Sequence, residues 1–457
     1  MNHNYCIPTL ANRSAPLNNV GNLQALQRRP VSNLSVMSKL LERLVAKQLI
    51  DYVITAHLLP DLQSAYRAHH STETAVVKVL SDILRALDNG NLVMLTMLDL
   101  SAAFDTVDHA VLLRRLGTSY GLGGTVLDWF RSYLNGRTQY VRRGTMQSSR
   151  STVACGIPQG SVLGPILFTL YTADLMRIVS KYGLNPHLYA DDTQIYGSCA
   201  PADTLQLEQR MSACIDEVAL WMKSNRLQLN AAKTEVLWCG SVRRQHQVPT
   251  TSFHIGADEI IPAKSVRNLG IYLDADASMT THVARSASQC FAALRQIRSV
   301  RRSISKTVLH TLVAALVFTR LDYGNATLFG LPGRLLNRLQ AVINAAARLV
   351  CSARKFDHIT PLLVDLHWLG IRERIDYKLA VLAYRCLHGL APMYLSDELL
   401  CVADIDSRRR LRSATSAANS MFHHWRPSVS GCSSSCLEWA VCSGYIVFVV
   451  GCLQETS

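Results

Sequence analysis

The stretch His187-Leu-Tyr-Ala-Asp-Asp-Thr-Gln-Ile-Tyr196 consists of two short apolar pieces that meet at Asp191 and Asp192. This pattern predicts a β-hairpin with a polar tip. An Asp-Asp pair in such a tip is, taken alone, most often turn chemistry. Earlier in the chain, Leu92-Val-Met-Leu-Thr-Met-Leu98 is a near-continuous apolar run that ends in Asp99. A run of this kind is typical of a strand buried on both faces.

Carboxylates therefore stand at the ends of two predicted strands. If the two strands lie side by side, Asp99, Asp191 and Asp192 converge at one edge of a sheet. Converging carboxylates repel one another, and a hard cation relieves the repulsion. Mg²⁺ suits oxygen ligands and keeps open positions for substrate phosphates. Two such ions about 3.5–4 Å apart would activate an attacking oxygen and stabilise the leaving one in phosphoryl transfer.

The remaining periodicity predicts mixed strands and helices, followed by helices alone. An amphipathic helix begins after Ser35, with apolar residues at helical spacing: Met37, Leu40, Leu41, Leu44, Val45, Leu49 and Val53. A second helix spans about 71–87 and is closed by the turn Asp88-Asn-Gly-Asn91. Further helical segments are expected at about 203–224, 283–300, 307–318, 333–351 and 374–388. This order predicts an α+β core with a helical C-terminal domain.

Composition narrows the class of protein. The chain has 457 residues, 49% of them hydrophobic and 18% charged, which excludes a mainly disordered chain. No N-terminal run pairs a basic start with an apolar stretch, so no secretory signal is expected. The 13 cysteines are odd in number and scattered, which indicates reduced thiols in an intracellular protein.

The net charge of +14 is concentrated in one window. Between Met279 and Phe356 twelve basic residues stand against a single acid, Asp322, so that this window carries +11. Such a surface favours a polyanion, most simply a nucleic acid backbone. A solvated basic face without a partner is the alternative. The basic residues are Arg285, Arg295, Arg298, Arg301, Arg302, Lys306, Arg320, Arg334, Arg338, Arg348, Arg354 and Lys355.

Three motifs in register carry a resemblance to a known family. Tyr189-Ala-Asp-Asp192 resembles the signature of reverse transcriptases. Leu98-Asp-Leu-Ser-Ala-Ala-Phe-Asp105, followed by Thr-Val-Asp-His109, resembles their first aspartate motif. Gly156-Ile-Pro-Gln-Gly-Ser-Val-Leu-Gly-Pro-Ile-Leu-Phe168 resembles the motif between them. The motif sequences are most similar to those of non-LTR (LINE-type), jockey-like retrotransposons. The resemblance extends from Arg29-Pro-Val-Ser32 to about residue 415.

The resemblance implies a right-hand polymerase. We expect an irregular leader over 1–28, fingers and palm over 29–275, a basic helical thumb or connection region over 276–415 and a divergent tail over 416–457. The implied activity is RNA-directed DNA synthesis from dNTPs, on an RNA template and a DNA primer or target DNA, with two Mg²⁺ ions or Mn²⁺ in their place. The resemblance also implies no membrane partner, and a ribonucleoprotein in nucleus and cytoplasm.

The same resemblance assigns roles to residues of the first and last motifs. Asp99 and Asp191 would be the main metal-binding carboxylates, with Asp192 third, and Leu100 would offer its carbonyl to the second metal. Lys233, within Leu227-Gln-Leu-Asn-Ala-Ala-Lys-Thr-Glu235, would protonate the leaving pyrophosphate, or be a surface lysine. Asn268-Leu-Gly-Ile-Tyr-Leu-Asp274 resembles the primer-grip hairpin.

Substrate contacts are implied for a further set of residues. Phe104 would exclude the 2′-hydroxyl of a ribonucleotide, or be an ordinary core residue. Gln159, Gly160 and Ser161 would lie against the incoming nucleotide and template, or form a tight loop leading into a helix. In the fingers region, Gln63-Ser-Ala-Tyr-Arg67 and Ser71-Thr-Glu73 resemble the segment that contacts the triphosphate and template. Within it Arg67 would clamp phosphate through its guanidinium, or be structural. Asp105 and Asp108 are expected to cap a helix.

Two rival functions stay open. One is a catalytically inactive nucleic-acid-binding remnant of a mobile element, against which the intact Asp99 and Asp191 argue. The other is an RNA-templated RNA polymerase, which the ring of Phe104 disfavours because a ribonucleotide needs space there.

The sequence also departs from the family. Jockey-like proteins carry an endonuclease domain before the polymerase, and 28 residues leave no room for one, so we expect no nicking of target DNA in cis, and a fragment or shortened reading frame. The tail holds Cys432, Cys436, Cys442 and Cys452 without a following histidine, which disfavours a zinc knuckle. Its apolar run Tyr445–Val450 is too short for a membrane span, and a frame-shifted tail is the simplest account.

Overall fold

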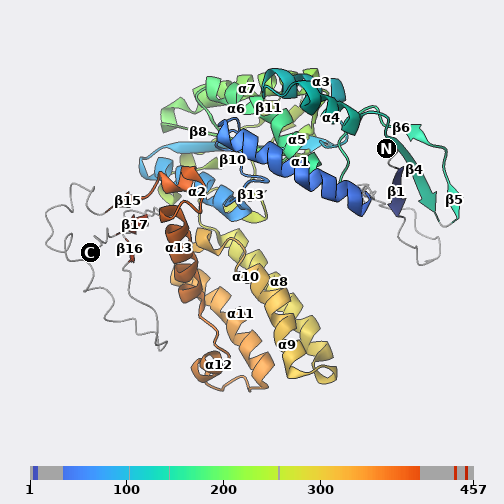
Figure 1. The fold of residues 1–457 in the computed structure, drawn as a ribbon. Coiled ribbons are helices and arrows are strands. Elements are labelled where there is room, and N and C mark those ends of the chain that lie inside the picture. Colours follow the sequence, from blue (N-terminus) through green and yellow to red (C-terminus); the bar gives the residue numbers. More distant parts are fainter. Residues whose placement is uncertain are drawn as a thin grey trace, which may run out of the picture.

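The computed structural model describes residues 4–8, 34–101, 103–143, 145–255, 258–401, 437–439 and 448–450. Figure 1 shows a part that mixes strands and helices, from which an elongated bundle of helices extends. The mixed part ends at the hairpin strand β14 (Ile271–Asp274), and the bundle begins with α8 (Thr280–Val300). The predicted α+β organisation with a helical C-terminal region is confirmed.

The central sheet has four antiparallel strands. They lie in the order β10 (Glu235–Cys239), β2 (Leu92–Leu98), β8 (Asp192–Cys199) and β7 (Asn185–Tyr189). Leu98 of β2 is paired with Thr193 of β8, so the end of β2 lies beside the beginning of β8. The two strands that carry the aspartates are therefore neighbours, as the convergence argument required.

Strand β2 is buried on both faces, as its continuous apolar run predicts. Leu92 and Met94 join a core with α1 (Val36–Thr55), α3 (His109–Thr118), α5 (Leu163–Thr172) and α7 (Thr204–Ser224). Val93 and Leu95 point the other way, into a core with α2 (Thr72–Asp88) and the bundle. Each such side chain contributes about 1.5–3 kcal/mol through burial.

Helix α1 is confirmed, but only the later part of its apolar stripe, with Leu49 and Val53, is buried. Ser35 caps it by accepting a hydrogen bond from Ser38 N–H at 3.1 Å. The apolar side chains of its first turns are largely exposed, from 44% to 73%, namely Met37, Leu40, Leu41 and Leu44. The buried face is instead formed by Ser38, Glu42, Ala46, Leu49 and Val53. The physical reason is that Glu42 has a polar partner inside, described below.

The C-terminal bundle contains the predicted helices. They are α8, α9 (Lys306–Val313), which continues through a π-helical turn (Ala314–Phe318) into α10 (Thr319–Leu321), α11 (Gly333–Cys351) and α13 (Ile371–Leu387). Between α11 and α13 lies the short helix α12 (Ile359–Asp365), which was not predicted. Leu339, Val342, Ile343 and Leu379 are among the fully buried residues of its core. The short helix α14 (Met393–Ser396) then returns to pack against α2.

The other elements are short or peripheral. The strands are β3 (Leu100–Ser101), β4 (Thr138–Arg143), β5 (Met146–Gln147), β6 (Ser151–Thr152), β9 (Gln228–Leu229), β11 (Phe253–Ile255), β12 (Asp258–Ile260), β13 (Ser265–Asn268), β15 (Leu400–Cys401), β16 (Leu437–Trp439) and β17 (Phe448–Val450). The helices are α4 (Gly124–Leu134) and α6 (Asp174–Lys181). The primer-grip segment is the hairpin of β13 and β14.

Both ends of the chain bear on the sequence expectations. The leader, expected to be irregular, holds strand β1 (Asn4–Pro8), which runs parallel to β4. An edge strand such as β4 offers unpaired backbone groups to any segment beside it. The tail cysteines Cys432, Cys436, Cys442 and Cys452 lie outside the described residues. No helix within the described part of the chain has the length and apolar character to cross a bilayer.

Candidate active site

The β7–β8 hairpin places Asp191 at its apex. Tyr189 is paired with Asp192, so the two turn residues are Ala190 and Asp191 rather than Asp191 and Asp192. Asp192 instead opens strand β8, because its backbone joins the ladder. Ala190 has a φ of 58°, in the left-handed region that favours glycine. A side chain held in this region indicates that the surrounding structure imposes the turn.

The segment Leu62–Ala65 supplies that restraint. The carboxamide oxygen of Gln63, which is buried, accepts hydrogen bonds from the N–H groups of Ala190 at 3.3 Å and Ala65 at 3.0 Å. Ser64 N–H donates to Leu188 O, and Leu188 N–H donates to Leu62 O, both at 2.9 Å. This segment therefore runs along β7 as an additional short strand. Sequence motifs assigned it to substrate contacts and did not reveal this bracing role.

A buried chain of polar groups continues from this segment. The hydroxyl of Ser64 lies 3.0 Å from Nε2 of His187 in β7 and 2.8 Å from the hydroxyl of Tyr394 in α14. Tyr394 also meets Thr74 of α2 at 3.4 Å. Burial lowers the pKa of His187 to about 3, assisted by the positive charges of Lys78 and His70, so its ring is neutral. The last helix of the described chain thus contacts β7, the first strand of the hairpin that carries Asp191.

Asp99 follows directly after the last β2–β8 pair and so lies beside Asp192. Its carbonyl accepts a hydrogen bond from Asn230 N–H at 2.9 Å, and its Oδ2 accepts one from the Asn230 side chain at 3.4 Å. Nζ of Lys233 lies 3.4 Å from the same oxygen. The Asp99 side chain is 28% exposed, so the carboxylate is fixed and reachable from solvent. Leu100, the next residue, is held in β3 by its pairing with Leu229.

One neighbour of Asp191 was missed in the sequence. The pKa of Tyr66 is raised, first by burial and then by the negative charge of Asp191 and by Tyr189. Tyr66 is half exposed and has a φ of 57°. Its place directly after Gln63-Ser-Ala gave no signal beyond the fingers motif itself.

The loop with Gln159, Gly160 and Ser161 is a tight turn before a helix. Ser161 N–H donates to Pro158 O at 3.1 Å, and Gly160 has a φ of 89°. This is the type II arrangement, which requires glycine at its third position. Ser161 is buried, and its hydroxyl accepts a hydrogen bond from Gly164 N–H at 2.9 Å. These residues therefore form the predicted tight loop, and such a loop is compatible with nucleotide contacts.

A carboxylate from α1 supports the same loop. Glu42 is 1% exposed, and its Oε2 accepts hydrogen bonds from the N–H groups of Val162 at 2.6 Å and Leu163 at 3.3 Å. These donors belong to the first turn of α5, where the helix dipole favours a negative charge. A polar face of α1 is buried for this reason.

The loop packs closely on the first aspartate motif. Gly156 N–H donates to Val107 O at 2.7 Å, and Ile157 N–H donates to Phe104 O at 2.8 Å. A Cβ at Gly156 would lie 2.8 Å from the carbonyl oxygen of Asp105, so a glycine is required. The two motifs therefore form one unit.

The two expected helix caps have different outcomes. Asp108 caps α3 by accepting a hydrogen bond from Val111 N–H at 2.9 Å, as predicted. The prediction for Asp105 is wrong, because its carboxylate accepts both hydrogen bonds from the amide of Gln159, at 2.9 and 3.0 Å. The exposed amide–carboxylate pair joins the two motifs across the loop.

Phe104 and Arg67 each show the structural side of their two interpretations. The partly buried ring of Phe104 stacks on Phe168 with centroids 4.7 Å apart. Nη1 of Arg67 donates to the carbonyl of Pro60 at 2.6 Å, and lies 3.4 Å from those of Asp61 and Gln63. Burial lowers the pKa of Arg67. This guanidinium holds its own loop, and its role as a phosphate clamp stays a prediction.

The donor set at the strand ends suits Mg²⁺. Within the described ranges no three His, Cys, Asp or Glu side chains gather as a complete metal cage. Mg²⁺ does not need one, because it is commonly bound through one or two carboxylates together with waters and substrate phosphates. Asp99, Asp191 and Asp192 are hard oxygen donors at one end of two neighbouring strands. They therefore fit the ion that the sequence predicts.

The basic window forms the exterior of the bundle. Across the part of the chain that the structure describes, none of its twelve basic residues is in an ion pair. The one acid of the window, Asp322, accepts a hydrogen bond from Nε of Arg374, which lies outside it, at 2.8 Å. Ten of the twelve are exposed, all but Arg301 and Arg348.

Comparisons with known proteins agree with this site. A family model described as reverse transcriptase (RNA-dependent DNA polymerase) matches residues 23–273, more than half of the chain. The "Probable RNA-directed DNA polymerase from transposon BS" of Drosophila melanogaster is 29% identical over 364 residues, which cover 76% of this chain and 39% of that protein. The RNA-directed DNA polymerase from mobile element jockey of the same species is 27% identical over 263 residues, covering 56% and 28%.

The chain spans about two fifths, or less, of the length of these relatives. Among solved structures, apo telomerase from Candida tropicalis is 12% identical with a TM-score of 0.38, covering 75% of this chain and 60% of that chain. A similarity of this size carries no argument about the site.

Proposed function

Because this chain belongs to the reverse transcriptase (RNA-dependent DNA polymerase) family, we propose that it is an RNA-directed DNA polymerase of a non-LTR retrotransposon. It would extend a DNA primer or a target-DNA end on an RNA template, using dNTPs. The observation that carries the proposal is the meeting of Asp99 with the Asp191–Asp192 hairpin at one end of β2 and β8. None of the comparisons favours the inactive remnant.

The carboxylates would hold the metal ions. Asp99 and Asp191 are the main ligands in this proposal, Asp192 is the third, and Leu100 offers its carbonyl. Two bound Mg²⁺ ions, or Mn²⁺, supply activation of the primer hydroxyl and neutralisation of the leaving pyrophosphate. The hydrogen bonds of Asn230 hold the carboxylate of Asp99, and the turn at Ala190 holds the backbone that carries Asp191. Such preorganisation lowers the cost of reaching the transition state.

Other residues of the site would bind and select the nucleotide. Lys233 lies at the edge of the site, where its ammonium can hold a proton for the pyrophosphate. Phe104 is backed by Phe168, so its ring cannot move aside for a 2′-hydroxyl. Gln159 and Gly160 stand on the exposed side of their turn, and Gln159 is oriented by Asp105. Ser161 is buried and supports the turn from within.

The basic exterior of the bundle would hold the RNA–DNA hybrid as a thumb. Among the described residues its arginines have no acidic partners, so they are available to contact phosphates without reading bases. Affinity for a hybrid is therefore expected to fall steeply with salt, because each contacted phosphate releases counterions. The same proposal includes action inside the cell, in nucleus and cytoplasm, as a ribonucleoprotein.

Primer extension tests the proposed function directly. With an RNA template, a labelled DNA primer and Mg²⁺, the wild type should incorporate dNTPs but not NTPs. The Asp191→Asn variant should lower the rate by at least about 1,000-fold, because a metal ligand worth several kcal/mol is lost. Asp51→Asn is the matched control, since this exposed carboxylate lies on α1, away from the strand ends.

Three outcomes would contradict it. Extension unaffected by Asp191→Asn would exclude the metal assignment. Hybrid binding by the wild type with no extension in Mg²⁺ or Mn²⁺ would favour the inactive remnant. Incorporation of NTPs in preference to dNTPs would favour an RNA polymerase.

A further inference from the structure

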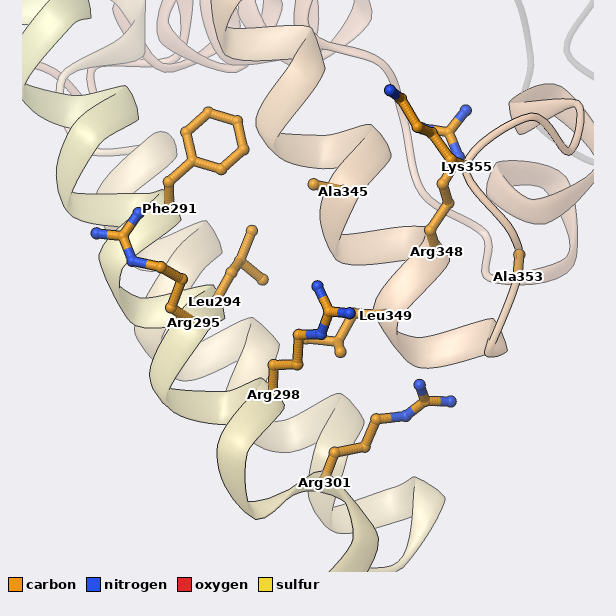
Figure 2. A pocket seen from close by; sticks show the side chains of 10 residues that line it. All are labelled: Phe291, Leu294, Arg295, Arg298, Arg301, Ala345, Arg348, Leu349, Ala353 and Lys355. Carbon is orange, nitrogen blue, oxygen red and sulfur yellow. The ribbon is translucent and has the colours of Figure 1, made fainter.

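A groove lies between α8 and α11, toward the ends of the helices where α8 finishes. It has a volume of about 500 Å³. Figure 2 shows Phe291 and Leu294 of α8 facing Ala345 and Leu349 of α11, with Ala353 and Lys355 on the segment that follows α11. At about 1.5 Å of rise per residue, the α8 part of the groove begins roughly 15 Å along the helix from Thr280, its palm end. The groove is thus separate from the carboxylates of the palm.

The rim of the groove is cationic. Five positive side chains line it: Arg295, Arg298, Arg301, Arg348 and Lys355. In Figure 2, Arg298 and Arg301 extend from α8 toward α11. None of the five has an ion-pair partner in the described structure. Nε of Arg348 is also buried without a hydrogen-bond partner among the described residues.

The acid closest in sequence does not neutralise this rim. The carboxylate of Asp357 accepts a hydrogen bond from the backbone N–H of Arg354 at 2.6 Å. Arg348 contacts only the backbone carbonyl of Asp357, at 3.3 Å. The guanidinium of Arg301 donates to the hydroxyl of Ser352. The positive charge of the groove is therefore left to an outside anion.

The floor of the groove is apolar. It is formed by Phe291, Leu294, Ala345, Leu349 and Ala353. A duplex presents phosphates and sugars to a protein surface, while the faces of its bases are stacked inside. A single strand can lay a base on an apolar or aromatic platform while its phosphates meet cations. Guanidinium groups also match phosphate better than ammonium groups do, and four of the five cations are arginines.

We propose that the α8–α11 groove binds a single-stranded segment of RNA, with phosphates on Arg298, Arg348 and Lys355 and a base on Phe291 and Leu349. The site is additional to the surface that holds the hybrid. The proposal rests on the proposed function only for the class of partner, a nucleic acid. Binding can be measured without polymerisation, so the two proposals can fail separately.

A variant that fills the groove but keeps its charge tests the base platform. Ala345→Phe should weaken binding of a fluorescent single-stranded RNA by about 30-fold, the middle of the range for loss of one stacked base. Binding of an RNA–DNA hybrid of the same sequence should change less than about twofold. Fluorescence anisotropy measures both, and circular dichroism checks folding.

A pair of charge reversals tests the phosphate contacts. Arg298→Glu removes a cation from the groove, and Arg338→Glu removes an exposed one from α11 outside it. We expect Arg298→Glu to weaken single-stranded RNA binding by at least about 10-fold and to lower its salt slope by about one or more. Arg338→Glu should affect the hybrid more than the single strand.

The proposal would be overturned by any of three results. If Ala345→Phe leaves single-stranded RNA binding intact while folding is retained, no base occupies the floor. If 4-thiouridine RNA crosslinks to the wild type but not to the peptide with Phe291, the strand lies elsewhere. An acidic peptide such as poly-glutamate could displace the RNA, and its own binding could be lost in the Ala345→Phe variant. That result would show that the groove binds a protein. A chain that passes these tests but does not extend primers would contradict only the proposed function.

Discussion

The β7–β8 hairpin region and the outer face of the bundle differ in how their charged side chains are paired. In the palm, three acids at or beside the site have polar partners: Asp99 has Asn230 and Lys233, Asp105 has Gln159, and Glu42 has the first turn of α5. In the bundle twelve basic side chains share no ion pair within the described structure. The palm therefore holds its acids in defined positions, whereas the described residues of the bundle carry unpaired positive charges around an apolar core.

The difference indicates which residues each of the two regions depends on. A site that must place ions to within a fraction of an ångström depends on supporting residues, and their removal should damage it. A surface that follows a phosphate backbone depends on the number of charges, and single losses should be tolerated. Substitutions in the supporting shell of the palm are therefore the sharpest way to test the contrast.

The largest effect is expected at Glu42. Glu42→Ala leaves two buried N–H groups, those of Val162 and Leu163, without an acceptor. The free energy of unfolding should fall by about 2–4 kcal/mol, since each unsatisfied buried donor costs about 1–3 kcal/mol. Urea denaturation followed by circular dichroism measures it. Asp51→Ala, an exposed acid on the same helix, should change stability by less than about 0.5 kcal/mol. Equal effects of the two variants would show that Glu42 braces nothing.

The next effect is a loss of stability in acid, to which both regions contribute. Burial lowers the pKa of His187 in β7 to about 3 and that of His282 in α8 to about 4, the latter against a raising influence of Asp274. The unfolded chain takes up these protons near pH 6.5, so each histidine removes stability as the pH falls below 6.5. At pH 5 the loss is about 2 kcal/mol for each.

Urea denaturation at pH 8 and at pH 5 measures this loss. The variant His282→Gln should retain only the part due to His187, while His254→Gln, at an exposed position, should leave the difference unchanged. A wild-type stability that is flat between these pH values would contradict the burial of both rings.

The smallest effect is expected at Tyr394. Tyr394→Phe keeps the ring against His187 but removes the hydroxyl that meets Ser64. One hydrogen bond is worth about 0.5–1.5 kcal/mol, so the Ala190 amide should exchange hydrogen about 3- to 10-fold faster and primer extension should slow by a similar factor. Tyr384→Phe, on the exposed face of α13, is the control. An unchanged rate of hydrogen exchange at the Ala190 amide would show that α14 does not stabilise the hairpin.

The sequence was sufficient for the fold class and for the elements with strong periodicity. Strand Leu92–Leu98 has the predicted bounds, because an apolar run ended by Asp99 and preceded by a turn leaves little choice. The helices of the bundle were also predicted, since apolar periodicity in them coincides with burial. The motifs identified the carboxylates, and their roles stay predictions until they are tested.

The sequence was not sufficient where a distant partner decides. The first part of the apolar stripe of α1 is exposed, because only the tertiary structure brings Glu42 to the N-terminus of α5 and turns that face inward. The position of Asp105 predicts a helix cap, but both of its carboxylate oxygens accept hydrogen bonds from the amide of Gln159 across the loop. The contact of Ser64 with Tyr394 joins residues 330 positions apart, and no local pattern indicates it.

That last contact has a consequence for folding during synthesis. All residues of the central sheet and the primer-grip hairpin have emerged by Asp274, yet Tyr394 follows roughly 120 residues later. At about 5–20 residues per second, the ribosome needs on the order of 10 s to supply it. During that interval the nascent palm has its sheet and the Gln63–Ser64 segment beside β7, but Ser64 and His187 lack their contacts with Tyr394, so this buried polar cluster is completed only once α14 has been made.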